Sequence, residues 1–305
     1  MSDTLLAEVP LISMKDQAAD PEGFAREFGR SFQRFGFAMV SDHGVPQDVV
    51  DRAWAMTKAF FALPEDEKRR YFVEGGGGAR GYTPYKTEIA KGATFVDLKE
   101  FWHVGRELSK DHRFKADMAP NIWPDRPEGF RETFLDLFSA LDDAGDRLLS
   151  AIARYLGLAP NWFDPAVRDG NSVLRLLHYP PVPADAPEVR AGAHEDINLI
   201  TLLLGAEEAG LQLLERSGEW LPVKPPEGAM VVNVGDMLQR LTNNFLPSTT
   251  HRVVNPPPER RGHARYSMPF FLHPAPDFLI ETLPSTITAH DYLHERLVEI
   301  GLVKK

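Results

Sequence analysis

The first half of the chain carries mainly the hydrophobic pattern of helices. In PEGFAREFGRSFQR (21–34) phenylalanine recurs at every fourth position, so the rings share one face of a helix. GFAMV (36–40) indicates a short strand, and helical spacing returns over 47–61. Pro64 and the acidic residues after it indicate the start of a further helix. The longest expected helix covers 127–157 and presents one apolar face, which predicts a helix that backs a sheet.

After Pro160 the pattern changes to short β-like runs separated by Gly, Pro, Asn and Asp residues. No segment between these runs is long enough for repeated β-α-β crossovers, which favours an antiparallel sandwich or barrel. From Ala289 the tail returns to a helical period. The β-like runs are 172–179, 199–204, 211–214, 220–223, 229–234, 250–254 and 265–272.

These patterns predict a fold that is mainly β with flanking helices. The length of 305 residues suggests about two domains on average, but no repeat or low-complexity linker divides the chain. We therefore expect a single unit over 1–305. It would have a mainly helical N-terminal region (1–160), a β core (170–275) and a C-terminal helix (285–305).

Composition narrows the possible functions. With 43% apolar and 26% charged residues the chain has ordinary globular composition. The net charge of −10 and the lack of a basic cluster disfavour nucleic-acid binding. No window approaches the roughly 20 apolar residues of a membrane span, and the N-terminus does not read as a secretory signal, so we expect a cytoplasmic protein. Because cysteine is absent, any metal must have nitrogen and oxygen ligands.

A glycine-rich segment, EGGGGARGYTPY (74–85), could suggest a phosphate-binding loop. It lacks the spacing of a P-loop or a dinucleotide fingerprint, and no apolar strand leads into it. We expect a surface loop here, with a lid near a pocket as the alternative.

His194 and Asp196 stand two residues apart at the head of an apolar run. On a strand, residues i and i+2 project from one face, so an imidazole and a carboxylate could meet one ion. His251, at the head of a later β-like run, is the strongest candidate for a third ligand. Two histidines and one carboxylate with open positions are the ligand set of non-haem Fe(II) oxygenases. In a chain with ten histidines, a turn cap and a surface histidine are the alternative.

Arg265 and Ser267 form a second pair at i and i+2, in the run RYSMPFFL. A guanidinium fork and a hydroxyl on one face of a strand suit a carboxylate. Burying both would be costly unless an anion bound them. The alternative is a strand that turns this polar face to solvent.

Together these motifs resemble the isopenicillin N synthase-like branch of the Fe(II)/2-oxoglutarate-dependent oxygenases. Upstream segments also match, namely VPLIS near residue 9, GFAMVSDHGV (36–45) and RGY (80–82), so the resemblance covers most of the chain. The segments that agree in order and spacing downstream are HED (194–196), GLQL (210–213), Trp220 with Val223, GAMVVNVGD (228–236), LTN (241–243), HRV (251–253) and RYS (265–267).

The resemblance implies a double-stranded β-helix, a jelly roll flanked by helices. By position it implies that His194, Asp196 and His251 ligate Fe(II), and that Arg265 and Ser267 hold the distal carboxylate of 2-oxoglutarate. It further implies a dioxygenase that uses O2, releases succinate and CO2, and hydroxylates or desaturates a small-molecule substrate.

The chain departs from the family where LHYPP (177–181) stands in place of Asn-Tyr before the prolines. Tyr179 is expected to bind the cosubstrate or the substrate, whereas His178 could face outward. Asn233 and Asp236 are expected to serve a turn of the fold. Candidates for pocket lining are Arg80, Tyr82, Phe245 and Phe271.

Two alternatives stay open at this point. An iron oxidase on the same scaffold would use no 2-oxoglutarate and would bind a substrate carboxylate with Arg265 and Ser267. A non-catalytic jelly-roll binding protein would keep the shell without turnover. The motifs do not encode the substrate, the reaction outcome or the oligomeric state.

Overall fold

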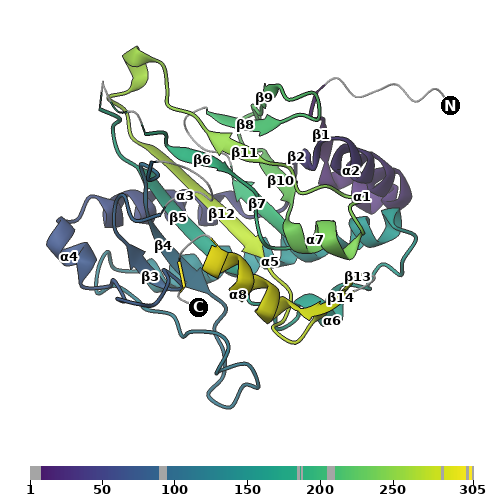
Figure 1. Ribbon diagram of the computed structural model, residues 1–305, viewed down its shortest axis with the longest axis horizontal. Helices are drawn as coiled ribbons and strands as arrows, with labels where there is room; N and C mark the ends of the chain where they lie inside the picture. Colours follow the sequence, from purple (N-terminus) through teal and green to yellow (C-terminus); the bar gives the residue numbers. More distant parts are fainter. Residues whose placement is uncertain are drawn as a thin grey trace.

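The computed structural model describes residues 8–88, 95–183, 186, 188–204, 210–282, 285–299 and 302–303. In this part of the chain the strands form an eight-stranded sheet with the order β1-β2-β10-β7-β12-β5-β4-β3, a four-stranded sheet with the order β6-β11-β8-β9, and the pair β13-β14 (Figure 1). The strands are β1 (Leu11–Ser13), β2 (Phe37–Ser41), β3 (Gly81–Thr83), β4 (Glu100–Gly105), β5 (Val173–Tyr179), β6 (Ala191–His194), β7 (Ile200–Leu204), β8 (Leu211–Leu214), β9 (Trp220–Pro222), β10 (Met230–Val234), β11 (His251–Val253), β12 (Arg265–Leu272), β13 (Leu279–Thr282) and β14 (Ser285–Thr288).

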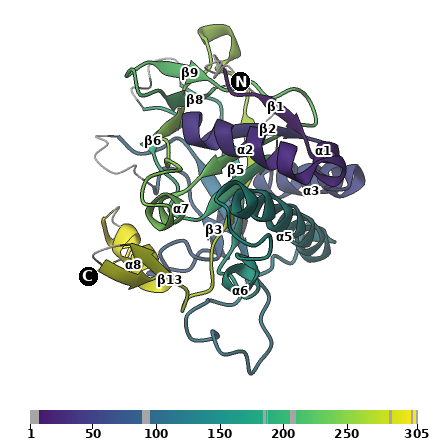
Figure 2. The same cartoon turned by 90° about the vertical axis from the view of Figure 1, so that its right-hand side faces the viewer.

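Helices cover one face of the large sheet, and a helix is the last described element of the chain (Figure 2). They are α1 (Met14–Ala19), α2 (Pro21–Phe35), α3 (Gln47–Phe61), α4 (Glu65–Arg69), α5 (Phe130–Tyr155), α6 (Asp164–Val167), α7 (Asp236–Leu241), α8 (Ala289–Glu299) and the short 3-10 helix Pro258–Arg260. No described helix is both long enough and apolar enough to cross a membrane.

Local sequence sets the bounds of α2. The carboxylate of Asp20 accepts a hydrogen bond from Gly23 N at 2.9 Å, and Pro21 occupies the first helical turn, where its missing N–H is not needed. The helix ends at Gly36, which adopts the left-handed region with φ 67°. A Cβ at Gly36 would lie 2.4 Å from Pro247 O, so both the turn and the close approach require glycine.

The main hydrophobic core lies between the large sheet and its helices. Helices α2, α3 and α5 lie on one side of that sheet, and the small sheet and α8 lie on the other (Figure 2). Helix α5 buries one apolar face, including Phe134, Leu141 and Leu148, against β7 and β12. The prediction that the longest helix packs against a sheet is therefore confirmed.

The opposite face of the large sheet packs on the small sheet. Phe37 and Val231 point to this side, where they meet Leu211 and Leu213 of β8 in a second apolar cluster. Their neighbours Ala38 and Val232 point to the helix side, as strand alternation requires. Two facing sheets, antiparallel except for the parallel pair β1-β2, confirm the predicted jelly roll with flanking helices.

The N-terminal half holds more strand than the sequence predicts. Besides β2, it supplies β1, β3 and β4 to the large sheet, and β4 pairs with β5 along its whole length. All six residues of β4 are buried, so no alternation of polar and apolar positions marks it as a strand. Strands β1 to β4 therefore belong to the same sheet as strands of the β core.

Candidate active site

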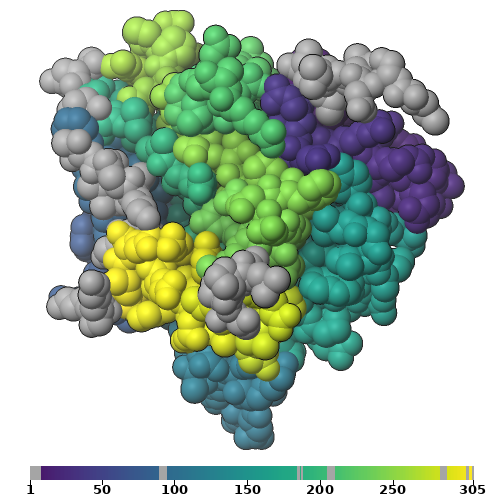
Figure 3. All heavy atoms as spheres, turned by 45° about the vertical axis from the view of Figure 1, so that its right-hand side comes forward, coloured from purple at the N-terminus to yellow at the C-terminus, as the bar shows by residue number. Residues whose placement is uncertain are grey.

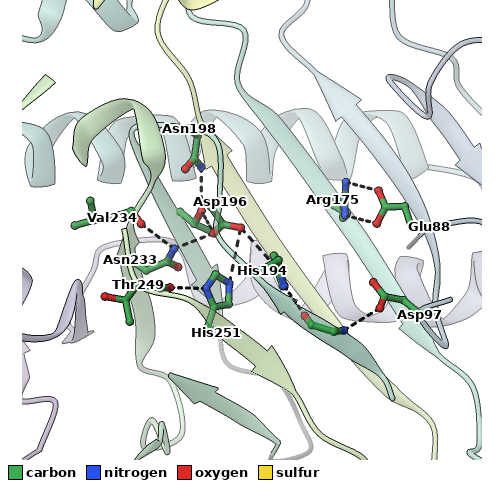
Figure 4. A network of polar contacts seen from close by, with 12 residues as sticks. Glu88, Asp97, Arg175, His194, Asp196, Asn198, Asn233, Val234, Thr249 and His251 are labelled. Carbon is green, nitrogen blue, oxygen red and sulfur yellow. Dashed lines mark hydrogen bonds and ion pairs between the residues drawn. The ribbon is translucent and has the colours of Figure 1, made fainter. Parts of the chain in front are cut away.

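The three predicted iron ligands converge at the junction of the two sheets (Figure 4). His194 is the last residue of β6 and His251 the first of β11, and they lie directly opposite each other in the small sheet. Asp196 follows in the connection to β7 of the large sheet. The Nε2 atoms of both histidines lie 3.8 Å from Asp196 Oδ1. The three ligand atoms lie within 4.8 Å of one another, a spacing that suits one ion.

Asp196 does not share a strand with His194, contrary to the sequence prediction. Strand β6 ends at His194, and Asp196 lies beyond its end. The bend that leads from the small sheet to the large sheet brings its carboxylate to the two imidazoles.

Each histidine turns Nδ1 toward a backbone carbonyl. His194 Nδ1 lies 2.8 Å from Gly192 O, and His251 Nδ1 lies 3.0 Å from Thr249 O. A carbonyl oxygen can only accept, so each ring donates Nδ1–H and keeps its lone pair on Nε2. This tautomer is the one that binds a metal through Nε2.

Asp196 is oriented through its second oxygen. Oδ2 accepts hydrogen bonds from Thr201 Oγ1 at 2.5 Å and from Asn233 Nδ2 at 2.8 Å. Asn198 Nδ2 donates to Thr201 Oγ1 at 2.9 Å, which directs the threonine hydroxyl proton to Asp196. Oδ1 is thereby left for the two imidazoles (Figure 4).

The assignment of Asn233 to a turn is wrong, because Asn233 lies in β10 and donates to Asp196. Asp236 is the first residue of α7 and lines the cavity, and its backbone N donates to Asp196 O at 2.7 Å. Thr201 is not among the residues predicted from the sequence. Its signal is a single hydroxyl within the apolar run of β7, buried in the structure.

The protonation states fit a divalent cation. Burial, reinforced by His251, lowers the pKa of His194 to about 4, although 36% of its side chain stays exposed. Burial acts to raise the pKa of Asp196, but the two imidazoles and the bonds from Asn233 and Thr201 lower it below its usual range. At neutral pH His194 is therefore a neutral imidazole and Asp196 an ionised carboxylate, the forms that metal ligands need. These residues fit Fe(II), for which two histidines and one carboxylate are a known ligand set.

Arg265, Ser267 and Tyr179 lie together on β12 and β5. Arg265 Nη1 donates to Ser267 Oγ at 3.2 Å, and the guanidinium stands 5.0 Å from the centre of the Tyr179 ring. Arg265 and Ser267 are each 2% exposed, so the alternative of a solvent-facing pair is wrong. Alternation along β12 places them on the inner face that also carries Phe271.

A cavity of about 600 Å³ adjoins the triad and includes His194 and Asp196 in its wall. Leu293 and Leu297 of α8 line it from the C-terminal side. In Figure 3 the yellow C-terminal segment lies against the green jelly-roll residues at this face. The wall does not include Arg265, Ser267 or Tyr179. These residues lie where β12 begins and β5 ends, whereas Phe271 lies near the other end of β12.

Of the four residues predicted to line the pocket, two line the cavity and two do not. Arg80 and Phe271 line the cavity. Tyr82 is buried in the main core instead, where its hydroxyl hydrogen bonds with the carboxylates of Glu65 and Glu100. Phe245 is 44% exposed and stacks on Tyr155, so both of these predictions are wrong.

The sequence also predicts where His178 and the glycine-rich segment lie relative to the pocket. His178 faces away from the cavity, with Nδ1 at 2.6 Å from Glu100 Oε1 and its ring stacked on Tyr266. The glycine-rich segment contributes residues 76–78 to the cavity wall, so it lies beside a pocket, and its role as a lid stays a prediction.

A polar network across the inner face of β4 and β5 escaped the sequence analysis. Arg175 contacts both carboxylate oxygens of Glu88 at 3.2 Å, and its Nε donates to His103 Nε2 at 2.6 Å. Lys99 Nζ lies 2.8 Å from both Glu88 and Asp97. Since Asp97 accepts from Gly192 N, the network reaches the strand that carries His194 (Figure 4).

Comparisons with known proteins agree with this geometry. Residues 9–126 match the family described as the N-terminal region of non-haem dioxygenase in morphine synthesis, and residues 170–274 match the 2OG-Fe(II) oxygenase superfamily. A curated relative, the 2-oxoglutarate-Fe(II) type oxidoreductase hxnY of Emericella nidulans, is 36% identical over 83% of this chain and 75% of its own length. Proline hydroxylase buaE of Petromyces alliaceus is 33% identical over 88% and 87%, respectively.

Solved structures with the same fold include relatives with bound cosubstrate. A 2OG-Fe(II) oxygenase family protein from Caulobacter crescentus has a TM-score of 0.90 and 54% identity, and covers 97% of this chain and 100% of its own. A full-length protein of Neurospora crassa, crystallised in complex with alpha-KG, has a TM-score of 0.86 and 29% identity, over 98% and 99%.

Proposed function

This chain belongs to the 2OG-Fe(II) oxygenase superfamily, and on that premise we propose that His194, Asp196 and His251 bind its iron. The enzyme is a non-haem dioxygenase that uses Fe(II), 2-oxoglutarate and O2. The observation that carries the assignment is the meeting of two Nε2 atoms and one carboxylate oxygen, each with its other polar atom already hydrogen bonded.

For the cosubstrate we propose that Arg265 and Ser267 bind the distal carboxylate of 2-oxoglutarate and that Tyr179 completes this end of the site. The support is a buried guanidinium with a hydroxyl 3.2 Å away, a donor pair that suits a carboxylate. Tyr179 packs with Leu177, Ala191 and Val253 in an apolar cluster suited to the carbon chain of the ligand.

The bound iron and 2-oxoglutarate supply the oxidising chemistry, with release of succinate and CO2. The protein positions the reactants. Thr201 and Asn233 hold Oδ2 of Asp196, and the carbonyls of Gly192 and Thr249 orient the two imidazole rings. Such supporting contacts keep the ligands oriented before the metal arrives.

The substrate is proposed to be a small molecule that occupies the 600 Å³ cavity next to His194 and Asp196 and is hydroxylated or desaturated there. A further structure of the Neurospora crassa relative, 29% identical, holds alpha-KG and thymine, which supports a ligand of this size. A cytoplasmic location stays a prediction from the sequence.

Neither alternative from the sequence, the iron oxidase without 2-oxoglutarate or the non-catalytic binding protein, is favoured. Relatives across most of the chain are named for 2-oxoglutarate, which disfavours an iron oxidase that uses none. The intact and oriented ligand set disfavours a non-catalytic binding protein.

Calorimetric titration of 2-oxoglutarate into the Mn(II)-loaded protein tests the cosubstrate site without turnover. Arg265→Gln should weaken binding by about 10- to 100-fold, because a charge-assisted pair is lost. Ser267→Ala should have a smaller effect. Arg34→Gln, which removes a part-buried pair with Glu215, is the control and should bind as the wild type does. Unchanged affinity in Arg265→Gln would contradict the assignment.

A further inference from the structure

The cations that line the cavity differ in how they are neutralised. Arg175 is paired with Glu88 through two N–H groups, and Lys99 lies 2.8 Å from both Glu88 and Asp97. Burial opposes ionisation of Glu88, but Arg175 and Lys99 together hold its pKa well below the usual range. Arg175 and Lys99 are therefore both already in ion pairs with the carboxylates of Glu88 and Asp97.

Arg80 has no such partner. Its side chain is buried, with 6% exposure for the residue. It donates from Nη1 to Ala79 O at 2.7 Å and from Nη2 to Asn171 Oδ1 at 3.4 Å, and its buried Nε has no acceptor. Among the described residues no carboxylate lies within ion-pair distance of it. Burial lowers the pKa of Arg80 only to about 10, so the group stays charged at neutral pH.

A buried charge without a counterion is costly, commonly by several kcal/mol. The fold nevertheless leaves space for the guanidinium of Arg80. A Cβ at Gly105 would lie 2.1 Å from Arg80 Cζ, so only glycine at this position of β4 lets the guanidinium lie where it does. A charge that is seated in this way in a cavity wall is a typical anchor for an anionic ligand.

Arg80 lines the same cavity as His194 and Asp196. His273, in the cavity wall, is influenced electrostatically by both Asp196 and Arg80, although burial is the main cause that lowers its pKa to about 4. Phe271 and Val173, cross-strand partners on β12 and β5, supply apolar surface to the same wall. A ligand anchored at Arg80 would therefore have an apolar surface to lie along.

We propose that Arg80, assisted by Asn171, binds the carboxylate of the substrate, and that the substrate is a small monocarboxylate whose apolar part lies against Phe271 and Val173. This inference rests on the proposed function, because it places the substrate in the cavity next to the iron ligands. Arg80 is distinct from Arg265, so substrate and cosubstrate carboxylates have separate cations.

Benzoate and its uncharged counterpart benzamide test the proposal. Each is titrated calorimetrically, under anaerobic conditions, into protein saturated with Fe(II) and 2-oxoglutarate, so that Arg265 is already occupied. The visible charge-transfer band of the chelated iron reports whether 2-oxoglutarate stays bound. The variants are Arg80→Gln, Gly105→Ala, which keeps the charge but displaces the guanidinium, and the control Arg52→Gln, which removes an exposed cation on α3.

We expect the wild type and Arg52→Gln to bind benzoate at millimolar concentrations, and benzamide about tenfold more weakly or not at all. Arg80→Gln should lose about tenfold or more in benzoate affinity, and Gly105→Ala should weaken it as well. If Arg80→Gln does not fold, Gly105→Ala decides.

Four results would overturn the proposal: no benzoate binding to the wild type, equal binding of benzamide, unchanged affinity in the variants, or loss of the band as benzoate displaces 2-oxoglutarate. Equal binding of benzamide would point to an uncharged carbonyl ligand instead. If the wild type forms no band with 2-oxoglutarate at all, the proposed function fails and this inference falls with it. A normal band without benzoate binding refutes only the role of Arg80.

Discussion

Thr201 and Asn233, two side chains outside the predicted ligand set, decide how Asp196 faces the histidines. Both donate to Asp196 Oδ2, so the carboxylate cannot rotate without losing two buried hydrogen bonds. Buried polar groups that lose their partners cost about 1–3 kcal/mol each. The orientation of the iron ligand is thus set before the metal binds.

Thr201→Val should therefore weaken Fe(II) binding by about 10- to 100-fold, because the variant keeps the shape of the side chain but removes the donor. Thr201→Ser keeps the hydroxyl and is the matched control, expected to stay within a few fold of the wild type. Competition with a chromogenic chelator measures both affinities. Equal Fe(II) affinity in Thr201→Val and Thr201→Ser would show that the hydrogen bond has no such role.

The sequence carries the identity of the ligands but not their supports. His194, Asp196 and His251 are recognisable because residue types and order agree with a known pattern. Thr201 and Asn233 sit in apolar runs that any buried strand could contain, and only the pairing of β7 with β10 brings them to one carboxylate. Contacts across strands of this kind have no signal in a single sequence.

The network on β4 and β5 links three elements and makes the fold sensitive to acid. Glu88 joins Arg175 of β5 to Lys99, and Asp97 joins Lys99 to Gly192 of β6. The pKa of Glu88 is depressed in the folded protein because Arg175 and Lys99 outweigh the effect of burial. A depressed carboxyl pKa stabilises the fold above the unfolded value of about 4.3, and this stabilisation is lost as the pH falls below it.

We expect the melting temperature of the wild type to fall between about pH 5 and pH 3, and Glu88→Gln to show a shallower fall over the same range. At pH 7 the variant should be less stable by roughly 3 kcal/mol, since two buried cations lose a charged partner. Glu22→Gln, at an exposed pair with Arg154, is the control. Thermal melts across this pH range check the prediction, and a slope identical to that of the wild type in Glu88→Gln would refute it.

Elements with a strong hydrophobic period are predictable from the sequence, and buried or very short ones are not. Helix α5 and strand β12 appear close to their expected bounds because their patterns are long and clear. Strand β6 has only four residues, two of them alanine and one glycine, and β4 is buried throughout. Both depend on pairing with distant strands for their existence.

At the scale of the whole molecule, the N-terminal region and the β core share one sheet. β2 pairs with β10, and β4 pairs with β5, so both neighbours of the core strands come from the first 160 residues. We therefore propose that 1–305 folds as a single cooperative unit.

A fragment of residues 160–305 should not fold, because β5 and β10 would present open, apolar edges. Circular dichroism should show no cooperative melting transition for the fragment and a single transition for the full chain. A fragment that melts cooperatively would contradict the single-unit proposal.

The most direct test of the account is the visible spectrum of the Fe(II)-loaded protein as 2-oxoglutarate is added without oxygen. We predict a charge-transfer band that saturates in the wild type and in Glu195→Ala, whose carboxylate contacts Thr250, and that is absent in Asp196→Ala. No band in the wild type, or an undiminished band in Asp196→Ala, would contradict it.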